Sequence, residues 1–276
     1  MKNKIAIIIL TFNSEKIIKR TIKAAKKISK EIIILDSFST DKTIEVVKNL
    51  KCKVYKRKFL NYSDQRNYAI KMCNKSYQWQ LHLDSDEVLS EQLVKNINDV
   101  LKKDIKNKSY IIKRHVHFMN RKLLFGATSN WHLRLFPSKS TICENKKYDQ
   151  HFVSNLMSEK INGSLLDINN KNLTDWISIH NKWSTLSSLE KYNKSSKLTK
   201  AKLFGNNIER TRFIKNIFFI LPIGLKSFSL FFVKYFILLG FLDGRAGFIY
   251  IFLNTLWFHT LIDAKKFEII LNKNNK

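Results

Sequence analysis

Runs of β-branched residues alternate with amphipathic stretches along the first part of the chain. Ile5–Leu10 is a continuous apolar run, as expected of a strand that is buried on both faces of a parallel sheet. From Glu15 to Lys27, apolar side chains recur at helical spacing. The alternation continues, and it predicts strands at Glu31–Leu35, Lys53–Lys56 and Trp79–Leu83 and helices at Asp41–Leu50 and Tyr62–Cys73. Strands separated by helices of this length predict an α/β fold with a doubly wound, mostly parallel sheet flanked by helices.

The pattern changes after Asp104. Tyr110–Phe118 and Leu133–Phe136 have the composition of strands in a mixed sheet, whereas Asn155–Asn172 is polar and predicts an irregular segment. From about Ser184 the chain is helical in pattern and basic. Lysines spaced three apart predict a cationic stripe on a helix, at Lys191, Lys194, Lys197 and Lys200.

The last third of the chain is unusually apolar. Phe213–Leu242 carries only three lysines as charges, and Ala246–Ile262 carries no formal charge over 17 residues. A spanning helix needs about 20 apolar residues, with roughly 17 as the lower limit. Helices that lie in the membrane interface or re-enter it fit these lengths best; buried core helices and a true span are the alternatives. We therefore expect a helical, membrane-associated extension.

Charge is the first anomaly of composition. The chain has 276 residues, with 50 Lys and Arg against 22 Asp and Glu, a formal net charge of +28. Such an excess attracts polyanions, either nucleic acid or anionic lipid, although a lysine-rich proteome with solvated lysines is an equally good cause. Cys52, Cys73 and Cys143 are odd in number and far apart, which argues against a disulfide framework or a zinc site and fits a reducing compartment. The run Ile5–Leu10 is too short for the core of a signal peptide, so nothing indicates export.

Polar clusters follow three of the predicted strands. They are Thr11-Phe12-Asn13, Asp36-Ser37 and Asp84-Ser85-Asp86-Glu87. In an open parallel sheet, ligands bind beyond the carboxyl ends of the strands, so these clusters converge on one edge. In extended backbone the carboxylates of Asp84 and Asp86 would face the same point. Mg²⁺ and Mn²⁺ are held by one or two carboxylates together with substrate phosphates, which makes this pair a candidate metal site.

Each of these residues also has a simpler interpretation. Asp-x-Asp occurs often in acidic surface turns, and Glu87 could be a carboxylate favoured at a helix N-terminus. Asp36 could cap a turn, and Asp41, just before a predicted helix, belongs more naturally to that class. Arg66 could offset a diphosphate or could be an ordinary arginine on a helix surface.

Four segments, in this order and spacing, resemble the family-2 inverting glycosyltransferases with the GT-A fold. They are Ile-Ile-Leu-Thr-Phe-Asn-Ser-Glu, Glu-Ile-Ile-Ile-Leu-Asp-Ser-Phe-Ser-Thr-Asp, Asp-Gln-Arg-Asn-Tyr-Ala and Leu-Asp-Ser-Asp-Glu, all within residues 5–90. Trp131-His132-Leu133-Arg134-Leu135-Phe136 and Phe241-Leu242-Asp243-Gly244-Arg245-Ala246-Gly247 resemble the branch that builds bacterial lipopolysaccharide core, O-antigen and capsule. One departure is Phe38, where the family commonly has glycine, and this puts the shape of that loop in question.

The resemblance implies roles for these residues. Arg66 would face the donor diphosphate, and Asp84 and Asp86 would hold Mg²⁺ or Mn²⁺, with Ser85 between them on the donor side. The nucleoside of a nucleotide-sugar donor, a UDP-sugar by preference, would contact the four residues Thr11, Asn13, Glu15 and Asp36.

Inversion requires a general base for the acceptor hydroxyl. In Tyr148-Asp149-Gln150-His151-Phe152, Asp149 is the residue that the resemblance favours, with His151 as the runner-up base or an acceptor contact. Trp131, His132 and Arg134 would shape the donor or acceptor pocket. Trp176, His180 and Trp183 resemble a stretch that follows the catalytic core in relatives, and packing explains them equally well.

The expected organisation has three parts: a nucleotide-sugar-binding half over residues 1–118, an acceptor-side half over 119–183 and the membrane-associated extension over 184–276. The expected function is transfer of a hexose-type sugar to a lipid-linked, lipopolysaccharide or other surface-glycan acceptor by a cytoplasmic protein, peripheral or monotopic on the inner membrane. A nucleotidyltransferase that makes a sugar nucleotide is disfavoured, because Thr11-Phe12-Asn13-Ser14 lacks a glycine-rich phosphate loop. A nucleic-acid-binding protein is disfavoured because apolar runs after Phe213 seek lipid or a core, so we expect no nucleic acid partner.

Overall fold

Two compact units make up the chain. The computed structural model describes residues 3–126, 128–146, 150–168, 172–192, 222 and 224–274. The first unit comprises Met1–Leu123 and Thr128–Asn170, and the second comprises Leu124–Ala127 and Lys171–Lys276. The expected boundary between residues 183 and 184 falls inside helix α5 (Leu173–Tyr192) of the second unit.

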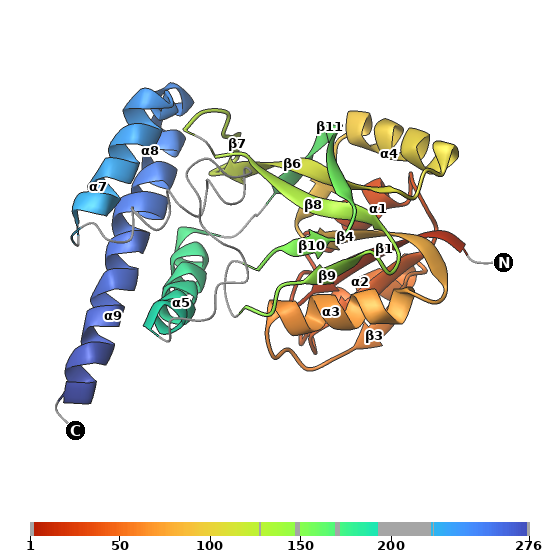
Figure 1. Cartoon of the computed structure of the whole chain (residues 1–276), viewed down its shortest axis with the longest axis horizontal. Coiled ribbons are helices and arrows are strands. Elements are labelled where there is room, and N and C mark those ends of the chain that lie inside the picture. The colour runs from red at the N-terminus through yellow and green to blue at the C-terminus, as the bar shows by residue number, and fades with distance from the viewer. Residues whose placement is uncertain are drawn as a thin grey trace. The chain divides into compact units, whose positions relative to one another are not determined.

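A mixed sheet forms the centre of the first unit. Its strands are β1 (Asn3–Thr11), β2 (Ile32–Asp36), β3 (Lys53–Lys56), β4 (Tyr77–Asp84), β5 (Glu87–Leu89), β6 (Lys108–Phe118), β7 (Arg121–Lys122), β8 (Asn130–Pro137) and β11 (Met157–Ile168). Within the described residues the sheet has nine strands in the order β3-β2-β1-β4-β8-β6-β11-β5, with β7 paired to β6 (Figure 1). β3, β2, β1 and β4 run parallel, and β8 runs antiparallel to both β4 and β6. The predicted α/β fold, parallel first and mixed later, is confirmed.

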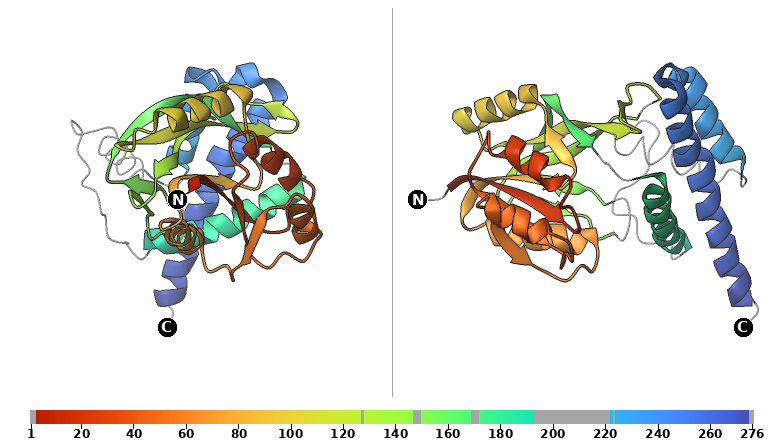
Figure 2. Two further views of the ribbon diagram at one scale, coloured as in Figure 1. Left: turned by 90° about the vertical axis from the view of Figure 1, so that its right-hand side faces the viewer. Right: turned by 180° about the vertical axis from the view of Figure 1, so that it is seen from behind.

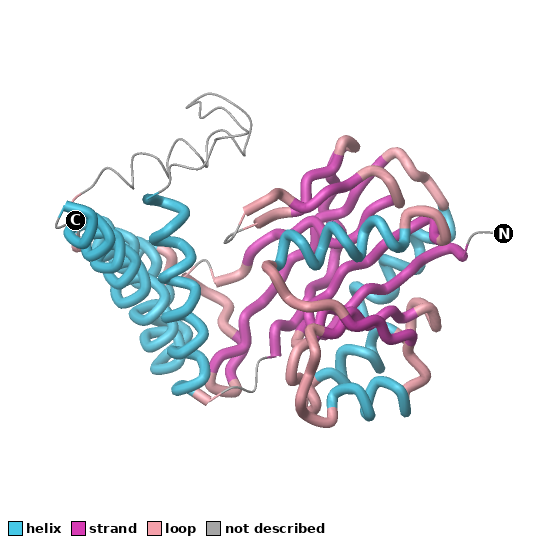
Figure 3. Tube along the Cα trace, turned by 90° about the horizontal axis from the view of Figure 1, so that it is seen from below, coloured by secondary structure: helices cyan, strands magenta, loops and turns pink. Residues whose placement is uncertain are grey.

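Helices cover both faces of this sheet (Figure 3). Alternate side chains of β1 point to opposite faces, as strand geometry requires. Ile7 and Ile9 belong to a core shared with helices α1 (Ile18–Ala25), α2 (Thr43–Asn49) and α4 (Glu91–Lys103). Ile8 packs instead with Ala69 of helix α3 (Tyr62–Cys73). Because each face has its own apolar layer, the sheet is held between two layers of helices. The ends of its strands remain available for a site.

The prediction of an irregular segment over Asn155–Asn172 is wrong. Most of it forms β11, which pairs in parallel with β6 along its length. Only Ile161 and Leu165 of this strand are fully buried apolar residues, while Ser158, Glu159 and Lys160 are exposed. The apolar alternation is therefore too sparse to mark a strand in the sequence. A two-stranded sheet of β9 (Thr141–Cys143) and β10 (Phe152–Ser154) was likewise not predicted.

The second unit is helical. It contains α5, α7 (Leu225–Phe232), α8 (Gly244–Phe252) and α9 (Phe258–Asn274), with π-helical turns at Val233–Ile237 and Leu253–Trp257. Figures 1 and 2 show α7 beside α8, with α9 continuing beyond it. Among the described residues no single helix is long and apolar enough to cross a bilayer. Leu225–Ile237 and Gly240–Lys273, which meet at a bend of 74°, reach that length and composition only together.

Aromatic side chains pack α5 into this unit. Trp176 stacks on His180 with ring centroids 3.5 Å apart, and His180 also packs against Trp183 and Phe258. The His180 ring nitrogen lies 2.8 Å from the backbone carbonyl of Trp176. Packing thus accounts for these three residues of the stretch that resembles relatives. The cationic stripe predicted around Lys194, Lys197 and Lys200 lies outside the described residues, and so does the side chain of Lys191.

Candidate active site

Three polar residues lie side by side at the carboxyl edge of the parallel strands. In the register of the sheet, Thr11 of β1 is the partner of Asp36 of β2, and Leu10 is the partner of Asp84 of β4. Neighbouring strands lie about 4.8 Å apart, so these side chains project from adjacent points of one edge. The Thr11 hydroxyl is buried and has no hydrogen-bond partner within the described residues. The structure therefore brings the three predicted clusters together, as the ends of parallel strands dictate.

A loop that carries Ser39 and Thr40 is held against the end of β1. Both oxygens of the Asp36 carboxylate accept hydrogen bonds from Ser39, one from its backbone N–H at 2.9 Å. The backbone N–H of Asn13 donates to the Ser39 hydroxyl at 2.9 Å, and the Asn13 side-chain oxygen accepts from the Thr40 N–H at 2.8 Å. Asp36 and Asn13 thus shape the loop, and a nucleoside would have to bind beside these bonds or replace them.

Glu15 and Asp41 join the same loop to the start of α2. The Glu15 carboxylate accepts from the backbone N–H of Lys42 at 2.9 Å. Asp41 accepts from the Glu15 N–H at 3.1 Å and from the Thr43 N–H at 3.0 Å. Asp41 therefore organises the turn before α2, as the simpler interpretation of that residue predicts. Glu15 has the same structural task in this conformation.

The substitution of phenylalanine for the family's glycine leaves the loop in a glycine-like conformation. Phe38 has φ = 63°, the left-handed region that a side chain rarely adopts, and its ring is 53% exposed. Asp36 and Asn13 hold the two residues that follow it, Ser39 and Thr40, through the bonds above. A residue other than glycine thus adopts the left-handed conformation here, which strains the backbone.

Two arginines and two carboxylates form a buried network at the end of β4. Arg66 of α3 donates from Nη2 to Asp84 Oδ1 and from Nη1 to the Leu83 carbonyl at 3.3 Å. Arg134 of β8 donates from Nη2 to Asp84 Oδ2 at 3.0 Å and to Glu87 Oε1 at 2.6 Å. Glu87 also accepts from the Asp84 N–H at 3.0 Å and is fully buried, with Arg66 5% and Arg134 7% exposed. The interpretation of Glu87 as a helix N-terminal carboxylate is wrong, and Arg66 is not a surface arginine.

A β-bulge directs Arg134 into this network. Tyr110 of β6 pairs with Leu135, while the next residue, Ile111, pairs with Leu133. Arg134 therefore has no register partner in β6, and the alternation of side chains along β8 is broken at that residue. Bulges next to functional sites commonly re-aim one side chain in this way.

The network shifts the pKa values of Asp84 and Arg134. Burial raises the pKa of Asp84, but the positive charges of Arg66 and Arg134 outweigh that effect and hold the pKa well below its usual range. Burial lowers the pKa of Arg134, but the carboxylates of Glu87 and Asp84 outweigh that effect, so the pKa is raised. Burial, and next to it the charges of Asp84 and Asp86, raises the pKa of Tyr62 to about 12. Asp84 is thus an anion, and Tyr62 is a neutral phenol beside it.

Ser85 and Asp86 lie in a tight turn between β4 and β5. The extended backbone that we expected from Asp84 to Asp86 is therefore wrong, and the two carboxylates are not aligned by strand geometry. The Ser85 hydroxyl lies 2.8 Å from the Ser14 hydroxyl, and the Ser85 carbonyl accepts from the Thr21 hydroxyl of α1 at 2.8 Å. These bonds fix the turn and leave Asp86 half-buried at the edge of the sheet.

The residues present fit a cation that shares its ligands with a substrate. Among the described residues there is no group of three or more His, Cys, Asp or Glu side chains that could hold a metal by themselves. Asp84 and Asp86 supply hard oxygen ligands, and Asp84 is held ionised. Mg²⁺ and Mn²⁺ suit such a pair when phosphates of a bound substrate complete the coordination.

Of the residues predicted to shape the donor or acceptor pocket, Arg134 belongs to this network and His132 precedes it by two positions on β8. Burial, then the charges of Arg134 and Arg114, lowers the pKa of His132 to about 3, and its Nε2 is buried without a hydrogen-bond partner in the described part of the chain. Trp131 is 40% exposed, with the Lys160 ammonium 5.0 Å from its ring centroid. His132 is therefore neutral at physiological pH.

The candidate base cannot be placed. Asp149 lies outside the described residues, so its role stays a prediction. His151, the runner-up, is half-exposed, with Nδ1 3.5 Å from the Glu144 carboxylate. Burial of Glu144 raises its pKa, and the ammonium of Lys146 more than offsets this, so the pKa is lowered.

Glu87 belongs to the acidic cluster that was singled out after the fourth predicted strand, but no role in the site was predicted for it. Glu144 and Tyr62 were not predicted as members of the site. Glu144 and Tyr62 carry no local pattern, and only the tertiary fold brings them close to the residues described above.

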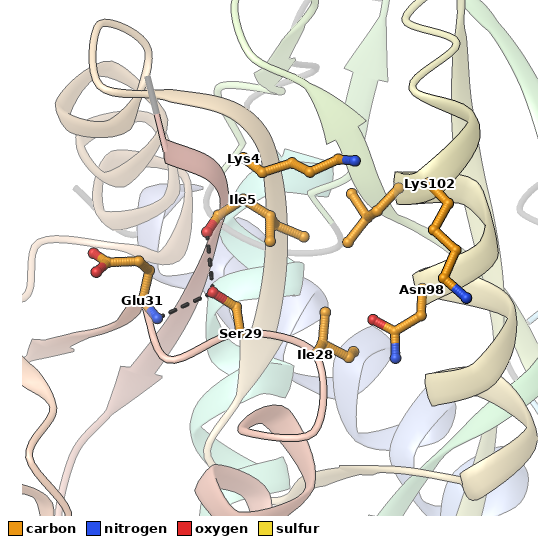
Figure 4. Close-up of a pocket in the computed structure, with 8 residues that line it drawn as sticks. Lys4, Ile5, Ile28, Ser29, Glu31, Asn98 and Lys102 are labelled. Carbon is orange, nitrogen blue, oxygen red and sulfur yellow. Dashed lines mark hydrogen bonds between the residues drawn. The ribbon is translucent and has the colours of Figure 1, made fainter. Parts of the chain in front are cut away.

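A surface pocket of about 410 Å³ lies at the other end of β1, next to Lys4 and Ile5 (Figure 4). The Ser29 hydroxyl there donates to the Ile5 carbonyl at 3.4 Å and accepts from the Glu31 N–H at 3.0 Å. The pocket adjoins the amino end of the strand, whereas ligands of parallel sheets bind at the carboxyl ends. None of the predicted site residues lines it.

The strand order and the acidic, arginine-lined carboxyl edge define the GT-A class of fold. The chain belongs to glycosyl transferase family 2, whose sequence model matches residues 6–163. An uncharacterized glycosyltransferase of Rickettsia typhi is 40% identical over 90 residues, which are 33% of this chain and 30% of that protein. One from Rickettsia prowazekii is 38% identical over the same length. The chain thus matches about a third of the length of these curated relatives.

Solved structures with similar folds include that of TarS residues 1–349 from S. aureus. It has a TM-score of 0.43 and 13% identity, covering 95% of this chain and 90% of that one. Glucosyl-3-phosphoglycerate synthase from Mycobacterium tuberculosis, in complex with Mn²⁺, UDP and glucosyl-3-phosphoglycerate, has a TM-score of 0.32 and 17% identity over 42% of this chain and 44% of that one. These likenesses add nothing to what the family match and the sheet topology establish.

Proposed function

We propose that this protein is an inverting, metal-dependent glycosyltransferase that moves a sugar from a UDP-sugar or related nucleotide-sugar donor to a lipid-linked, lipopolysaccharide or other surface-glycan acceptor at the cytoplasmic face of the membrane. One observation carries the proposal: Thr11, Asp36 and Asp84 meet at the carboxyl edge of the sheet, beside Asp86. Membership of glycosyl transferase family 2 supports the same reaction class.

The charges at this edge support a need for a cation. The two guanidinium groups of Arg66 and Arg134 are balanced by the carboxylates of Asp84 and Glu87. Asp84 and Asp86 are both carboxylates, and carboxylates by themselves do not attract the phosphates of a nucleoside diphosphate. Asp84 and Asp86 would hold Mg²⁺ or Mn²⁺. That ion would reverse the local charge and offset the charge that builds on the leaving diphosphate.

The residues of the donor side would act by position and charge. The Thr11 hydroxyl is the open hydrogen-bonding group at the end of β1, so it is suited to a polar group of the nucleotide. The bonds that Asp36 and Asn13 make to the Ser39–Thr40 loop would set its shape for the nucleoside. Arg66 would shift part of its interaction from Asp84 to the diphosphate.

Inversion follows from a single displacement. The acceptor hydroxyl oxygen forms a bond to the anomeric carbon while the bond from that carbon to the diphosphate oxygen breaks, and its electron pair leaves with the nucleoside diphosphate. The hydroxyl proton passes to a general base, for which Asp149 is the candidate and His151, beside Glu144, the alternative. Trp131, His132 and Arg134 would line the pocket in which donor and acceptor meet.

The acceptor and the location are inferred from the second unit and from charge. The net charge of +28 favours an anionic surface. The helices from Leu225 onward expose many large apolar side chains, which water does not favour. A lipid-linked acceptor would bring substrate and protein to the same surface.

Turnover of UDP-sugars in the presence of Mn²⁺ tests the proposal. We expect hydrolysis or transfer that is lost on chelation with EDTA and lost at least a hundredfold in Asp86→Asn, because a neutral amide is a poor ligand for a hard cation. Asp99→Asn is the matched control, since Asp99 is a half-exposed aspartate on α4 with a surface lysine partner. Equal turnover in Asp86→Asn and Asp99→Asn would show that the metal role is wrong.

A further inference from the structure

The helical hairpin of the second unit turns through an apolar segment. The arm that ends at Ile237 and the arm that begins at Gly240 meet at a bend of 74°. Turns that face water are usually built from Gly, Pro, Asn, Asp and Ser. This one instead exposes five large apolar side chains, namely Ile237, Leu238, Leu239, Phe241 and Leu242.

Residues 124–126 are hydrogen-bonded to the same turn. The Asp243 carboxylate, which is buried, accepts the backbone N–H of Leu124 at 3.1 Å and that of Phe125 at 2.9 Å. The Gly126 N–H donates to the Leu238 carbonyl at 2.8 Å. Leu124 is itself 57% exposed, so it extends the apolar surface of the turn.

Glycines make this close contact possible. A Cβ on Gly126 would lie 2.6 Å from the Ile251 side chain, and its φ of +64° also favours glycine. A Cβ on Gly240 would lie 2.3 Å from the same side chain and 2.7 Å from the Lys234 carbonyl. The turn is therefore tightly packed on its inner side. The exposure of apolar side chains on its outer side is a feature of a well-packed turn.

The backbone of the turn satisfies its own hydrogen bonds. The Leu238 N–H donates to the Val233 carbonyl at 2.8 Å, the Leu239 N–H to the Phe236 carbonyl at 3.3 Å and the Leu242 N–H to the Leu239 carbonyl at 3.0 Å. Bonds of this kind also close turns that face water. In hydrocarbon, unpaired backbone groups are costly, so irregular backbone is tolerated there only when its groups are paired.

We propose that this apolar tip, made of Leu124, Ile237–Leu239, Phe241 and Leu242, enters the hydrocarbon of one leaflet of an anionic bilayer. The occupant follows from the chemistry: the six exposed side chains of the tip are all apolar, and the net charge of +28 draws the protein to an anionic surface. Exposed phenylalanines behind the tip, Phe228, Phe232, Phe236, Phe248 and Phe252, would lie at the depth of the interface. The inference rests on the proposed function only in placing the protein at a membrane.

Partition into vesicles of phosphatidylethanolamine and phosphatidylglycerol, measured by flotation with the full chain, tests the tip. Ile237→Asp is the main variant, and Ile142→Asp of β9 is its matched control, because the two isoleucines are 63% and 65% exposed. A charge placed in hydrocarbon is costly, so we expect Ile237→Asp to weaken partition at least about tenfold and Ile142→Asp to leave it within about twofold. The milder Leu124→Ser should weaken it severalfold without adding charge, and high salt should leave part of the binding of the unaltered protein intact.

Equal partition of the two Asp variants would overturn the proposal, and so would binding that high salt abolishes completely. If Ile237→Asp instead splits an oligomer while partition is unchanged, the tip contacts a second copy of the chain and the proposal is wrong. Donor hydrolysis without vesicles, measured on the same proteins, separates the two proposals: Ile237→Asp should keep it. Absence of hydrolysis in every protein would contradict the proposed function. The partition data would still show whether the apolar tip enters the bilayer.

Discussion

Replacing Arg134 by methionine tests whether the network at the end of β4 is an ion-pair network or merely a set of close contacts. Arg134 Nη2 bonds Asp84 Oδ2 at 3.0 Å and Glu87 Oε1 at 2.6 Å, and both Arg134 and Glu87 are buried. Methionine keeps much of the side-chain length and removes only the charge and the donors. Glu87 is then left in the core with the Asp84 N–H as its remaining partner in the network.

The size of the effect follows from that burial. Removing one partner of a buried ion pair costs about 3–5 kcal/mol, because the other charge stays desolvated. For a protein of this length a change of that size lowers the apparent melting temperature by roughly 6–20 °C. Arg134 also helps to hold the pKa of Asp84 low, and a depressed carboxyl pKa contributes stability above its unfolded value near 4. The difference between the two proteins should therefore be largest at neutral pH and shrink as the pH falls below about 4.

Thermal unfolding of the full chain, followed by circular dichroism, measures this. Arg121→Met on β7 is the control, since Arg121 is exposed, and such a change should stay within about 0.5 kcal/mol. The double variant Glu87→Gln/Arg134→Met should recover part of the loss, because the neutral amide no longer leaves a charge buried. A melting temperature for Arg134→Met within about 2 °C of the unaltered protein would refute the reasoning, and so would strict additivity in the double variant.

Three further outcomes are expected. The pKa of His132 in the folded protein is lowered to about 3, so unfolding takes up a proton as the pH falls from 6.5 to about 3, and stability is lost over that range. His132→Gln should reduce this slope of the free energy of unfolding by up to about 1.4 kcal/mol per pH unit, measured by urea titration. An unchanged slope would count against the interpretation. Phe38→Gly should raise the free energy of unfolding by up to about 1 kcal/mol, since relief of the strain at φ = 63° exceeds the extra entropy of an unfolded glycine. A loss of more than about 1 kcal/mol would show that packing of the Phe38 ring stabilises the fold. Asp243→Asn should cost about 1–3 kcal/mol, because an amide is a weaker acceptor for the two backbone N–H groups of Leu124 and Phe125, and unchanged protection of those amides in hydrogen exchange would contradict it.

The first half of the fold could be predicted from the sequence because each element carries a strong local pattern. Lys53–Lys56 and Tyr62–Cys73 coincide with β3 and α3, and Ile5–Leu10 lies inside β1. β11 was not predicted, because its partners lie far away in sequence and only two of its apolar residues are fully buried. Pairing with β6, rather than a local preference, makes it a strand.

The candidate site was predictable as far as strand ends determine it. Asp36, Thr11 and Asp84 meet because parallel strands end at the same edge. The turn at Ser85 and Asp86 was not predictable from spacing, since it is held by Ser14 and Thr21 of other segments. The position of Arg134 depends on a bulge in β8, and no sequence signal marks a bulge of this kind.

Calorimetric binding of UDP, with Mn²⁺ and then with EDTA in its place, tests most directly whether the carboxyl edge of the sheet binds a nucleoside diphosphate through a shared cation. The account predicts that Mn²⁺ tightens UDP binding at least about tenfold in the unaltered protein, and that Asp86→Asn removes this gain while Asp99→Asn keeps it. UDP binding of equal strength with and without Mn²⁺, or a gain that survives Asp86→Asn, would contradict the account.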